Sequence, residues 1–282
     1  MRFSISTAFQ PVDHLSVLAR AADELGYHSM AVPDHVVDLE ELATPYPYTS
    51  DGSRRWSYDA AWPDPWVLVG SLAAVTTRLR FLTSIYVPAI RSPFQVAKSV
   101  GTAAVLSGNR VALGVGVGWC REEFELLGQD FSTRGRRTDE ALALMAELWK
   151  PGWTEFDGEF YSAPRLVMEP TPSEPIPILV GGLSEVAFRR AARHDGWVGD
   201  VYTTDEAIAT RLAEVRRDVG AEGDFSVIVA LSDAFLPEQF EKAEAGGVTD
   251  CWTMPWAYYH GLECSVEQKV DALGALRGQG QG

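Results

Sequence analysis

The fold of this chain is constrained most by a regular alternation of short β-rich runs with longer stretches of helical periodicity. Strands are predicted at 2–9, 28–32, 79–84, 111–117, 176–180, 197–200, 225–231 and 248–254, and helices at 12–25, 65–76, 93–106, 138–149, 184–193, 205–219, 237–245 and 265–276. Eight alternations predict an α/β fold, a (β/α)8 TIM barrel, because a doubly wound sheet usually ends after five or six strands. We expect residues 1–282 to form one such domain.

Two connections are too long for a simple barrel. One follows the second strand, at 33–63, and the other joins the fourth helix to the fifth strand, at 151–175. Both are rich in aromatic residues and proline, which is typical of a lid or binding loop and also of a small core packed under a loop. Tyr46, Trp56 and, after the eighth strand, Trp256 are the side chains we expect to contact a substrate.

The charge and cysteine content exclude several classes of partner. A formal net charge of −15 argues against a nucleic-acid or anionic-membrane surface. The sequence has neither an apolar run of membrane-spanning length nor a signal pattern at its start. Its three cysteines lack CxxC spacing, which predicts neither a disulfide framework nor a structural zinc site. We therefore expect a cytoplasmic protein.

In a barrel of this kind the chemistry lies at the carboxyl ends of the strands. The first strand is not followed by His-x-His, so a metal site is not expected. After the second strand come Asp34 and His35, and such a histidine can act as a general acid or base oriented by a carboxylate. The alternative is that Asp34 caps the loop and His35 packs against Trp62 or another neighbour.

Glycine-rich segments follow two further strands. GVGVGW at 114–119 lacks the last glycine of a dinucleotide fingerprint, and its glycines are interpreted as allowing close approach of a flat ligand. Glu122 and Glu123 follow, and they are either catalytic or part of a solvated helix start. Gly181 and Gly182 precede a helix and predict an anion site, although an ordinary capped turn fits equally well.

Six segments together resemble the bacterial luciferase-like monooxygenases, which are flavin- and deazaflavin-dependent TIM barrels. In order they are VPDH at 32–35, TSIYVPAIRSPFQVAK at 83–98, LSGNRVALGVGVGW at 106–119, RGRRTDEALALMAELW at 134–149, FDGEFY at 156–161 and PILVGGLSEVAFRRAARHDGW at 177–197. The DH pair with GxGxGW and RGRRTDE resembles the branch that uses the deazaflavin coenzyme F420 more than the branch that uses flavin mononucleotide, FMN. The resemblance covers essentially the whole chain.

The resemblance also implies roles for individual residues. It predicts a cis peptide between Ser84 and Ile85, at a bulge that supports the cofactor ring. The implied cofactor-binding residues are Asp34, Ser84, Ile85, Gly116, Gly118 and Trp119 around the ring and Gly181 and Gly182 at the phosphate. His35 is the implied proton donor or acceptor. Trp119 stands where the sugar-phosphate dehydrogenases of this family have a catalytic glutamate, which argues against that activity and leaves Glu122 as a substitute.

We therefore expect an enzyme that transfers hydride between F420 and a small organic substrate. The alternatives are an FMN-dependent monooxygenase that uses oxygen and a separate flavin reductase, and a non-catalytic flavin-binding barrel. The resemblance further implies a homodimer. Six arginines are available for the anionic tail of F420 or are ordinary surface charges, namely Arg54, Arg55, Arg91, Arg134, Arg136 and Arg137.

Overall fold

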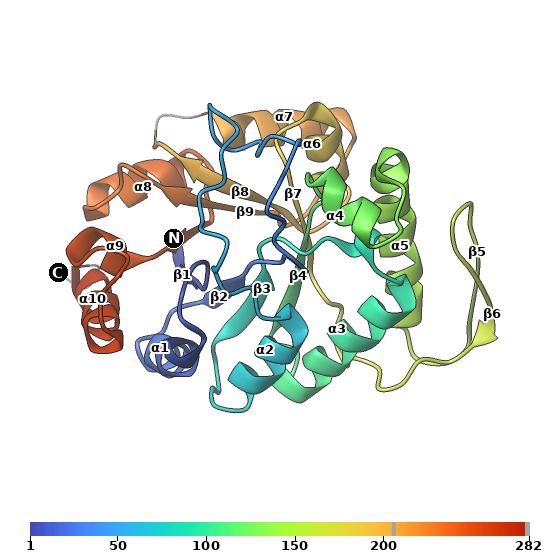
Figure 1. Ribbon diagram of the computed structural model, residues 1–282, viewed down its shortest axis with the longest axis horizontal. Coiled ribbons are helices and arrows are strands. Elements are labelled where there is room, and N and C mark those ends of the chain that lie inside the picture. The colour runs from blue at the N-terminus through green and yellow to red at the C-terminus, as the bar shows by residue number, and fades with distance from the viewer. Residues whose placement is uncertain (205–206, 280–282) are drawn as a thin grey trace.

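The chain folds into a closed barrel of eight parallel strands, described here for residues 1–204 and 207–279 in a computed structural model (Figure 1). The strands are β1 (Arg2–Ser6), β2 (Ser29–Val32), β3 (Arg80–Thr83), β4 (Val111–Val115), β7 (Ile178–Gly181), β8 (Gly196–Tyr202), β9 (Ser226–Leu231) and β10 (Asp250–Thr253). They follow one another around the barrel, and β10 closes it by pairing with β1. The predicted TIM barrel is confirmed.

Helices cover the outside of the barrel, as Figure 1 shows. They are α1 (Val12–Glu24), α2 (Pro65–Ala73), α3 (Pro93–Ser107), α4 (Arg121–Leu126), α5 (Arg134–Leu148), α6 (Glu185–Ala191), α7 (Ile208–Asp218), α8 (Pro237–Ala245), α9 (Pro255–Tyr259) and α10 (Val266–Gln279), with 3-10 turns η1 (Pro88–Ile90) and η2 (Phe131–Thr133). The short helices α4 and α9 were not predicted. The first two residues of the helix predicted at 205–219 lie outside the described residues.

The period-two alternation of the strands divides the core into two layers. Along β9, Val227 and Val229 join the large cluster between the barrel and its helices, whereas Ile228 joins a smaller cluster. That smaller cluster also contains Leu82, Leu179 and Val198, from three other strands. Both faces of each strand contact apolar side chains, and for this reason the strand sequences are almost continuously hydrophobic.

The two long connections have different structures. Residues 33–64 contain no helix or strand and run across the carboxyl ends of the barrel strands. The second connection contains an antiparallel hairpin of β5 (Thr154–Asp157) and β6 (Ser162–Leu166), which projects from the barrel beside α5 (Figure 1). The sequence analysis predicted the insertion but missed the hairpin, because its strands are short and carry few of the apolar residues that mark a buried strand.

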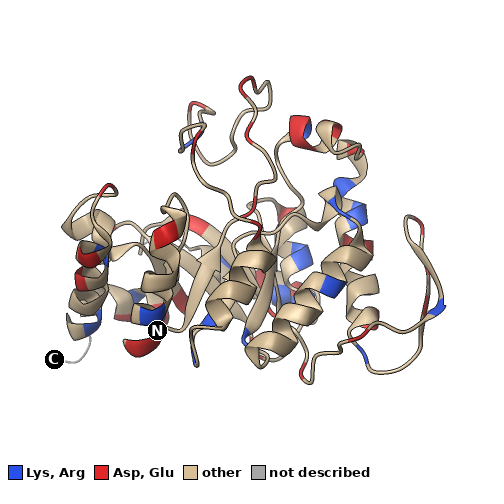
Figure 2. Ribbon diagram, turned by 60° about the horizontal axis from the view of Figure 1, so that its bottom comes forward, with Lys and Arg blue, Asp and Glu red and all other residues tan. Residues whose placement is uncertain are grey.

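Acidic and basic residues are interspersed over the helices and loops in the view of Figure 2. Among the described residues, no helix is both long enough and apolar enough to cross a membrane.

Candidate active site

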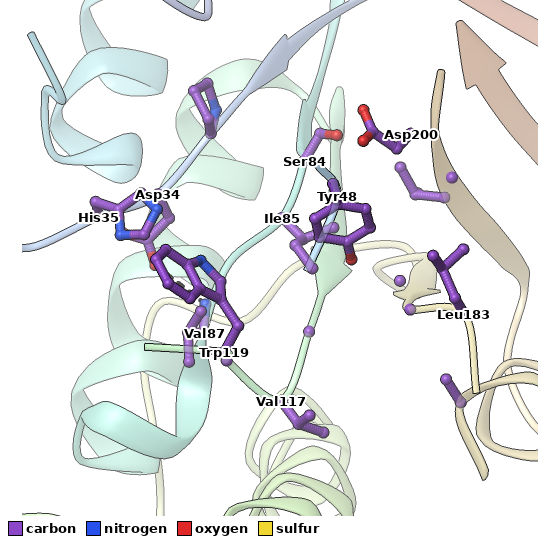
Figure 3. Close-up of a pocket in the computed structure, with 18 of the residues that line it drawn as sticks. Asp34, His35, Tyr48, Ser84, Ile85, Val87, Val117, Trp119, Leu183 and Asp200 are labelled. Carbon is purple, nitrogen blue, oxygen red and sulfur yellow. Dashed lines mark hydrogen bonds between the residues drawn. The ribbon is translucent and has the colours of Figure 1, made fainter. Parts of the chain in front are cut away.

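A cavity of about 1030 Å³ opens at the carboxyl ends of the barrel strands. Residues at or just beyond seven of the strands line it, including Ser6, Pro33, Ser84, Gly116, Gly181, Val198 and Met254. Figure 3 shows His35 and Trp119 on one side of the cavity and Leu183 and Asp200 on the other. Its volume is at the upper end of the roughly 300–1,000 Å³ common for small-molecule sites, so a ring cofactor and a substrate fit together.

Asp34 lies at the cavity but directs its carboxylate away from a ligand. The two carboxylate oxygens accept hydrogen bonds from the Arg91 guanidinium, both at 2.7 Å, and one also accepts from the backbone N–H of Val87 at 3.0 Å. The Asp34 side chain is 0% exposed. Burial opposes the charge on Arg91, but the Asp34 carboxylate outweighs it and raises the pKa of Arg91. Asp34 therefore ties the second strand to the segment after the third, and a direct carboxylate contact with the cofactor ring does not fit.

His35 is paired with Glu123, a buried carboxylate from α4. His35 Nδ1 lies 3.5 Å from Glu123 Oε2, and Glu123 Oε1 accepts a hydrogen bond from the Val36 backbone N–H at 2.7 Å. Burial acts to raise the pKa of Glu123, but the hydrogen bond and charge of His35, together with the backbone donors, lower it below its usual value. The carboxylate therefore stays ionised, holds the proton of His35 on Nδ1 and leaves Nε2 for a ligand.

Glu122, predicted as a catalytic substitute, has another role. Its Oε1 accepts hydrogen bonds from the backbone N–H groups of Ala43 and Thr44, at 2.8 and 2.9 Å. Burial acts to raise its pKa, yet these backbone donors and its own N–H lower it to about 2. Glu122 does not line the cavity, so it anchors the first insertion, and Glu123 takes the place beside His35. Consecutive helical residues point about 100° apart, so the start of α4 decides which glutamate faces inward.

The peptide bond between Ser84 and Ile85 is cis, as the resemblance predicted. Both residues line the cavity (Figure 3). The side chain of Ile85 occupies the space that two glycines leave free: a Cβ on Gly116 would lie 2.1 Å from Ile85 Cδ1, and one on Gly181 would lie 2.9 Å from it. Gly116 and Gly181 therefore make room for Ile85, and Gly116 and Gly118 also line the cavity.

One end of the cavity carries a guanidinium without a carboxylate partner. Arg134 donates to the carbonyl oxygens of Gly118 and Phe131, and among the described residues no carboxylate lies within ion-pair distance of it. Burial, and then the nearby Arg121, lower its pKa. Arg190 is neutralised by Asp139 at 2.5 Å. Gly135, Gly182 and Ser184 complete this end.

The other arginines considered for a cofactor tail are engaged elsewhere. Arg54 pairs with Asp38, Arg55 with Asp200 and Arg136 with Glu159. Arg137 donates to the hydroxyl of Tyr161, and Arg91 pairs with Asp34. Arg134 is thus the member of this set that retains a free charge at the cavity.

Aromatic rings surround His35 in the cavity wall. The centroids of Trp62, Trp56 and Trp119 lie 5.0, 5.3 and 6.0 Å from that of His35. The sequence analysis gave packing of His35 against Trp62 as the alternative to a role in proton transfer. In the structure, His35 packs against Trp62 and also lines the cavity. Tyr46 and Trp56 line the cavity as predicted, and Phe9, Tyr48, Trp62 and Trp252 also line it.

The prediction that Trp256 contacts a substrate is wrong. Its side chain is 0% exposed, it belongs to the hydrophobic core, and it does not line the cavity. The residue lies in α9, with the ammonium of Lys269 from α10 over its ring at 6.0 Å. The sequence analysis placed Trp256 in a loop at the mouth because α9 is too short for its period to be recognised. Among the described residues, no cluster of three or more His, Cys, Asp or Glu could hold a metal ion.

A parallel barrel with a cavity at the carboxyl ends of its strands is the architecture of TIM-barrel enzymes. Residues 1–245 match the model of the luciferase-like monooxygenase family, and the chain belongs to this family.

Two curated relatives match the chain to different extents. An uncharacterized protein of Mycobacterium tuberculosis is 42% identical over 89% of this chain and 88% of its own length. An F420-dependent glucose-6-phosphate dehydrogenase of Gordonia bronchialis is 30% identical over 64% of this chain, which spans 51% of that protein.

Solved structures share the fold. An F420-dependent secondary alcohol dehydrogenase, in complex with an F420–acetone adduct, superposes with a TM-score of 0.72 at 15% identity, covering 100% of this chain and 99% of its own. The oxygenating constituent of 3,6-diketocamphane monooxygenase of Pseudomonas putida, in complex with FMN, has a TM-score of 0.64 at 16% identity, covering 96% and 83%.

Proposed function

We propose that this protein is an oxidoreductase that binds F420 in the cavity and transfers a hydride between it and a small organic substrate. The observation that carries the proposal is that one cavity joins a free guanidinium, Arg134, to a histidine oriented by a buried carboxylate. The first suits a phosphate, and the second suits proton transfer to a reacting oxygen.

The residues present fit a ring cofactor with a phosphate. Ser84, Ile85 and Val87 offer a surface for the flat ring, and Arg134 with the Gly182 backbone offers a place for the phosphate. When bound, the deazaflavin supplies the hydride chemistry that no side chain can perform. The chain's own residues orient the two ligands, exclude water and handle the proton.

His35 would handle that proton through Nε2. Because Glu123 fixes the ring through Nδ1, Nε2 donates when the imidazole is charged and accepts when it is neutral. In reduction, the substrate carbonyl carbon receives the hydride and its oxygen receives the proton from Nε2. In oxidation, the hydroxyl proton passes to Nε2 as the hydride leaves.

An FMN-dependent monooxygenase, supplied with reduced flavin by a separate reductase, is the second candidate. It is favoured by the structural likeness to the oxygenating constituent of 3,6-diketocamphane monooxygenase, which was solved in complex with FMN. The F420 assignment takes precedence because the DH sequence at 34–35, GxGxGW at 114–119 and RGRRTDE at 134–140 resemble the F420-dependent branch of the family.

Titration of the purified protein with F420 and, separately, with FMN tests the cofactor, with quenching of the cofactor's fluorescence as the readout. We expect saturable quenching with F420 and a dissociation constant at least tenfold higher for FMN. The reverse preference would contradict the F420 assignment. Binding of a cofactor without turnover by wild type in any reduced-cofactor assay would favour a non-catalytic barrel.

A further inference from the structure

We infer that the substrate is an uncharged, apolar ring compound with one carbonyl or hydroxyl group. The inference rests on the proposed function and names its substrate class. It follows from the end of the cavity around His35, which we call the aromatic chamber: the side chains of Phe9, His35, Tyr46, Tyr48, Trp56, Trp62 and Trp119.

The chamber walls are rings that brace one another. The centroid of Tyr46 lies 5.1 Å from that of Trp56 and 5.2 Å from that of Trp119. Trp56 in turn lies 5.3 Å from Trp62, which packs edge-on at 5.8 Å to Phe9. Rings packed edge to face keep their orientation, so they present a preformed apolar surface. Such a surface favours a ligand of matching shape that buries its own apolar area.

The carboxylates around the chamber already have partners. Asp200 pairs with Arg55 at 2.8 Å, and Asp34 pairs with Arg91 at 2.7 Å. Glu123 is bonded to His35 and to the Val36 N–H, and its side chain is only 4% exposed. A cationic substrate group would lose its hydration here without finding a free carboxylate, and it would recover only part of that loss on the tryptophan faces. An anion would meet the negative charge of Glu123.

His35 offers the hydrogen bond that a polar group of the substrate would make in the chamber. Nε2 of His35 is the ring nitrogen that Glu123 leaves free, and it can make one hydrogen bond to a carbonyl or hydroxyl oxygen. Arg134 also lines the cavity, and its Nε donates to the carbonyl oxygen of Gly118 at 3.1 Å.

Three ring ketones of similar shape test the inference on the wild-type protein. They are neutral 4,4-dimethylcyclohexanone, its cationic isostere 1,1-dimethyl-4-oxopiperidinium, and anionic 4-oxocyclohexanecarboxylate. Binding is followed by tryptophan fluorescence, because Trp56, Trp62 and Trp119 form the chamber wall. We expect saturable binding of the neutral ketone, weaker binding of the cation by several-fold and of the anion by at least tenfold. Equal or tighter binding of either ion, or no binding of the neutral ketone, would overturn the inference.

A pair of variants in α4 tests the electrostatic part. Glu123→Gln should bring the affinity for 4-oxocyclohexanecarboxylate at least threefold closer to that for the neutral ketone. Glu125→Gln is the matched control, because Glu125 is exposed on the same helix and does not line the cavity. An unchanged ratio in Glu123→Gln, with circular dichroism like that of wild type, would overturn the assignment of this selectivity to Glu123.

The readout does not require a bound cofactor, which separates the two proposals. A protein that binds F420 or FMN but not the neutral ketone would contradict this inference and leave the proposed function standing. A protein that binds the ketone but neither cofactor would contradict the proposed function and keep the chamber as a site for neutral ring compounds.

Discussion

Two buried carboxylates, Asp23 and Glu123, lie at opposite ends of the barrel and have opposite roles. At the amino-terminal end, Asp23 of α1 accepts hydrogen bonds from the backbone N–H groups of Thr77, Arg78 and Leu79, at 2.8, 2.7 and 2.6 Å. Arg110 completes this end by donating to the carbonyl oxygens of Ala73 and Leu79, among others. These polar groups are satisfied within the protein, so this end contributes stability.

At the carboxyl end, comparable groups are left partly open. Glu123 holds His35 by one ring nitrogen and leaves the other without a protein partner in the described structure, and Arg134 has no carboxylate partner there. Polar groups whose partners within the protein are incomplete, such as His35 Nε2 and the Arg134 guanidinium, lower the stability of the fold but can bind a ligand or transfer a proton. The role of these two carboxylates therefore depends on the donor: backbone N–H groups make Asp23 structural, and a side chain that faces the cavity gives Glu123 a part in the site.

The largest effect on turnover, with little effect on stability, is expected from His35→Gln. Loss of a positioned acid or base typically lowers turnover about 10² to 10⁴-fold. Because the side chain belongs to the open end, the unfolding midpoint should change little. Steady-state kinetics with reduced cofactor, beside urea denaturation, measure both quantities. A variant with wild-type turnover would remove His35 from the mechanism.

Asp23→Ala should lower the stability of the protein and leave cofactor binding unchanged. Removing the carboxylate leaves three backbone N–H groups without their acceptor, at roughly 1–3 kcal/mol each, so the unfolding free energy should fall by about 3 kcal/mol or more. The dissociation constant for the cofactor should remain close to wild type at a temperature where the variant is folded. Loss of cofactor affinity in a folded variant would contradict the separation of the two ends.

The Asp23 carboxylate should make the stability of the protein depend on pH in the acid range. Burial acts to raise the pKa of Asp23, but the backbone N–H groups and the Thr77 hydroxyl outweigh it and lower the pKa below 3.8. Its stabilisation is therefore complete above the unfolded pKa and is lost as pH falls through the lower folded value. Urea denaturation between pH 6 and pH 3 should show a smaller loss of stability in Asp23→Asn than in wild type. Equal losses would exclude Asp23 as the source.

Arg134→Gln should weaken cofactor binding without destabilising the fold. A hydrogen bond to a charged group is worth about 1.5–3 kcal/mol, which corresponds to roughly a 10- to 100-fold higher dissociation constant. Arg20→Gln is a matched control on the exposed face of α1, distant in the fold from the cavity lining. Fluorescence titration measures both variants, and equal affinities would exclude Arg134 as the phosphate ligand.

The smallest catalytic effect is expected from Glu123→Gln. The amide still accepts from His35 but carries no charge, so turnover should fall about tenfold in steady-state kinetics. Wild-type turnover would remove the carboxylate from the mechanism. Rescue by Glu123→Asp would further support a positioning role.

The sequence by itself determined the barrel and the location of its site. Alternating β and α periods report burial locally, and the carboxyl ends of parallel strands meet at one face whatever their separation along the chain. The pattern therefore predicts that His35, Tyr46 and Trp56 lie at that face, and the family resemblance adds Ser84 and Ile85.

The tertiary structure alone decided which side chains point into the cavity. Glu123 rather than Glu122 faces His35 because of where α4 begins, and Trp256 is buried because α9 turns it under α10. The glycines at 116 and 181 accommodate the side chain of Ile85, which follows the third strand, in a contact between segments far apart in sequence. Direction depends on packing between distant elements, which sequence periodicity does not record.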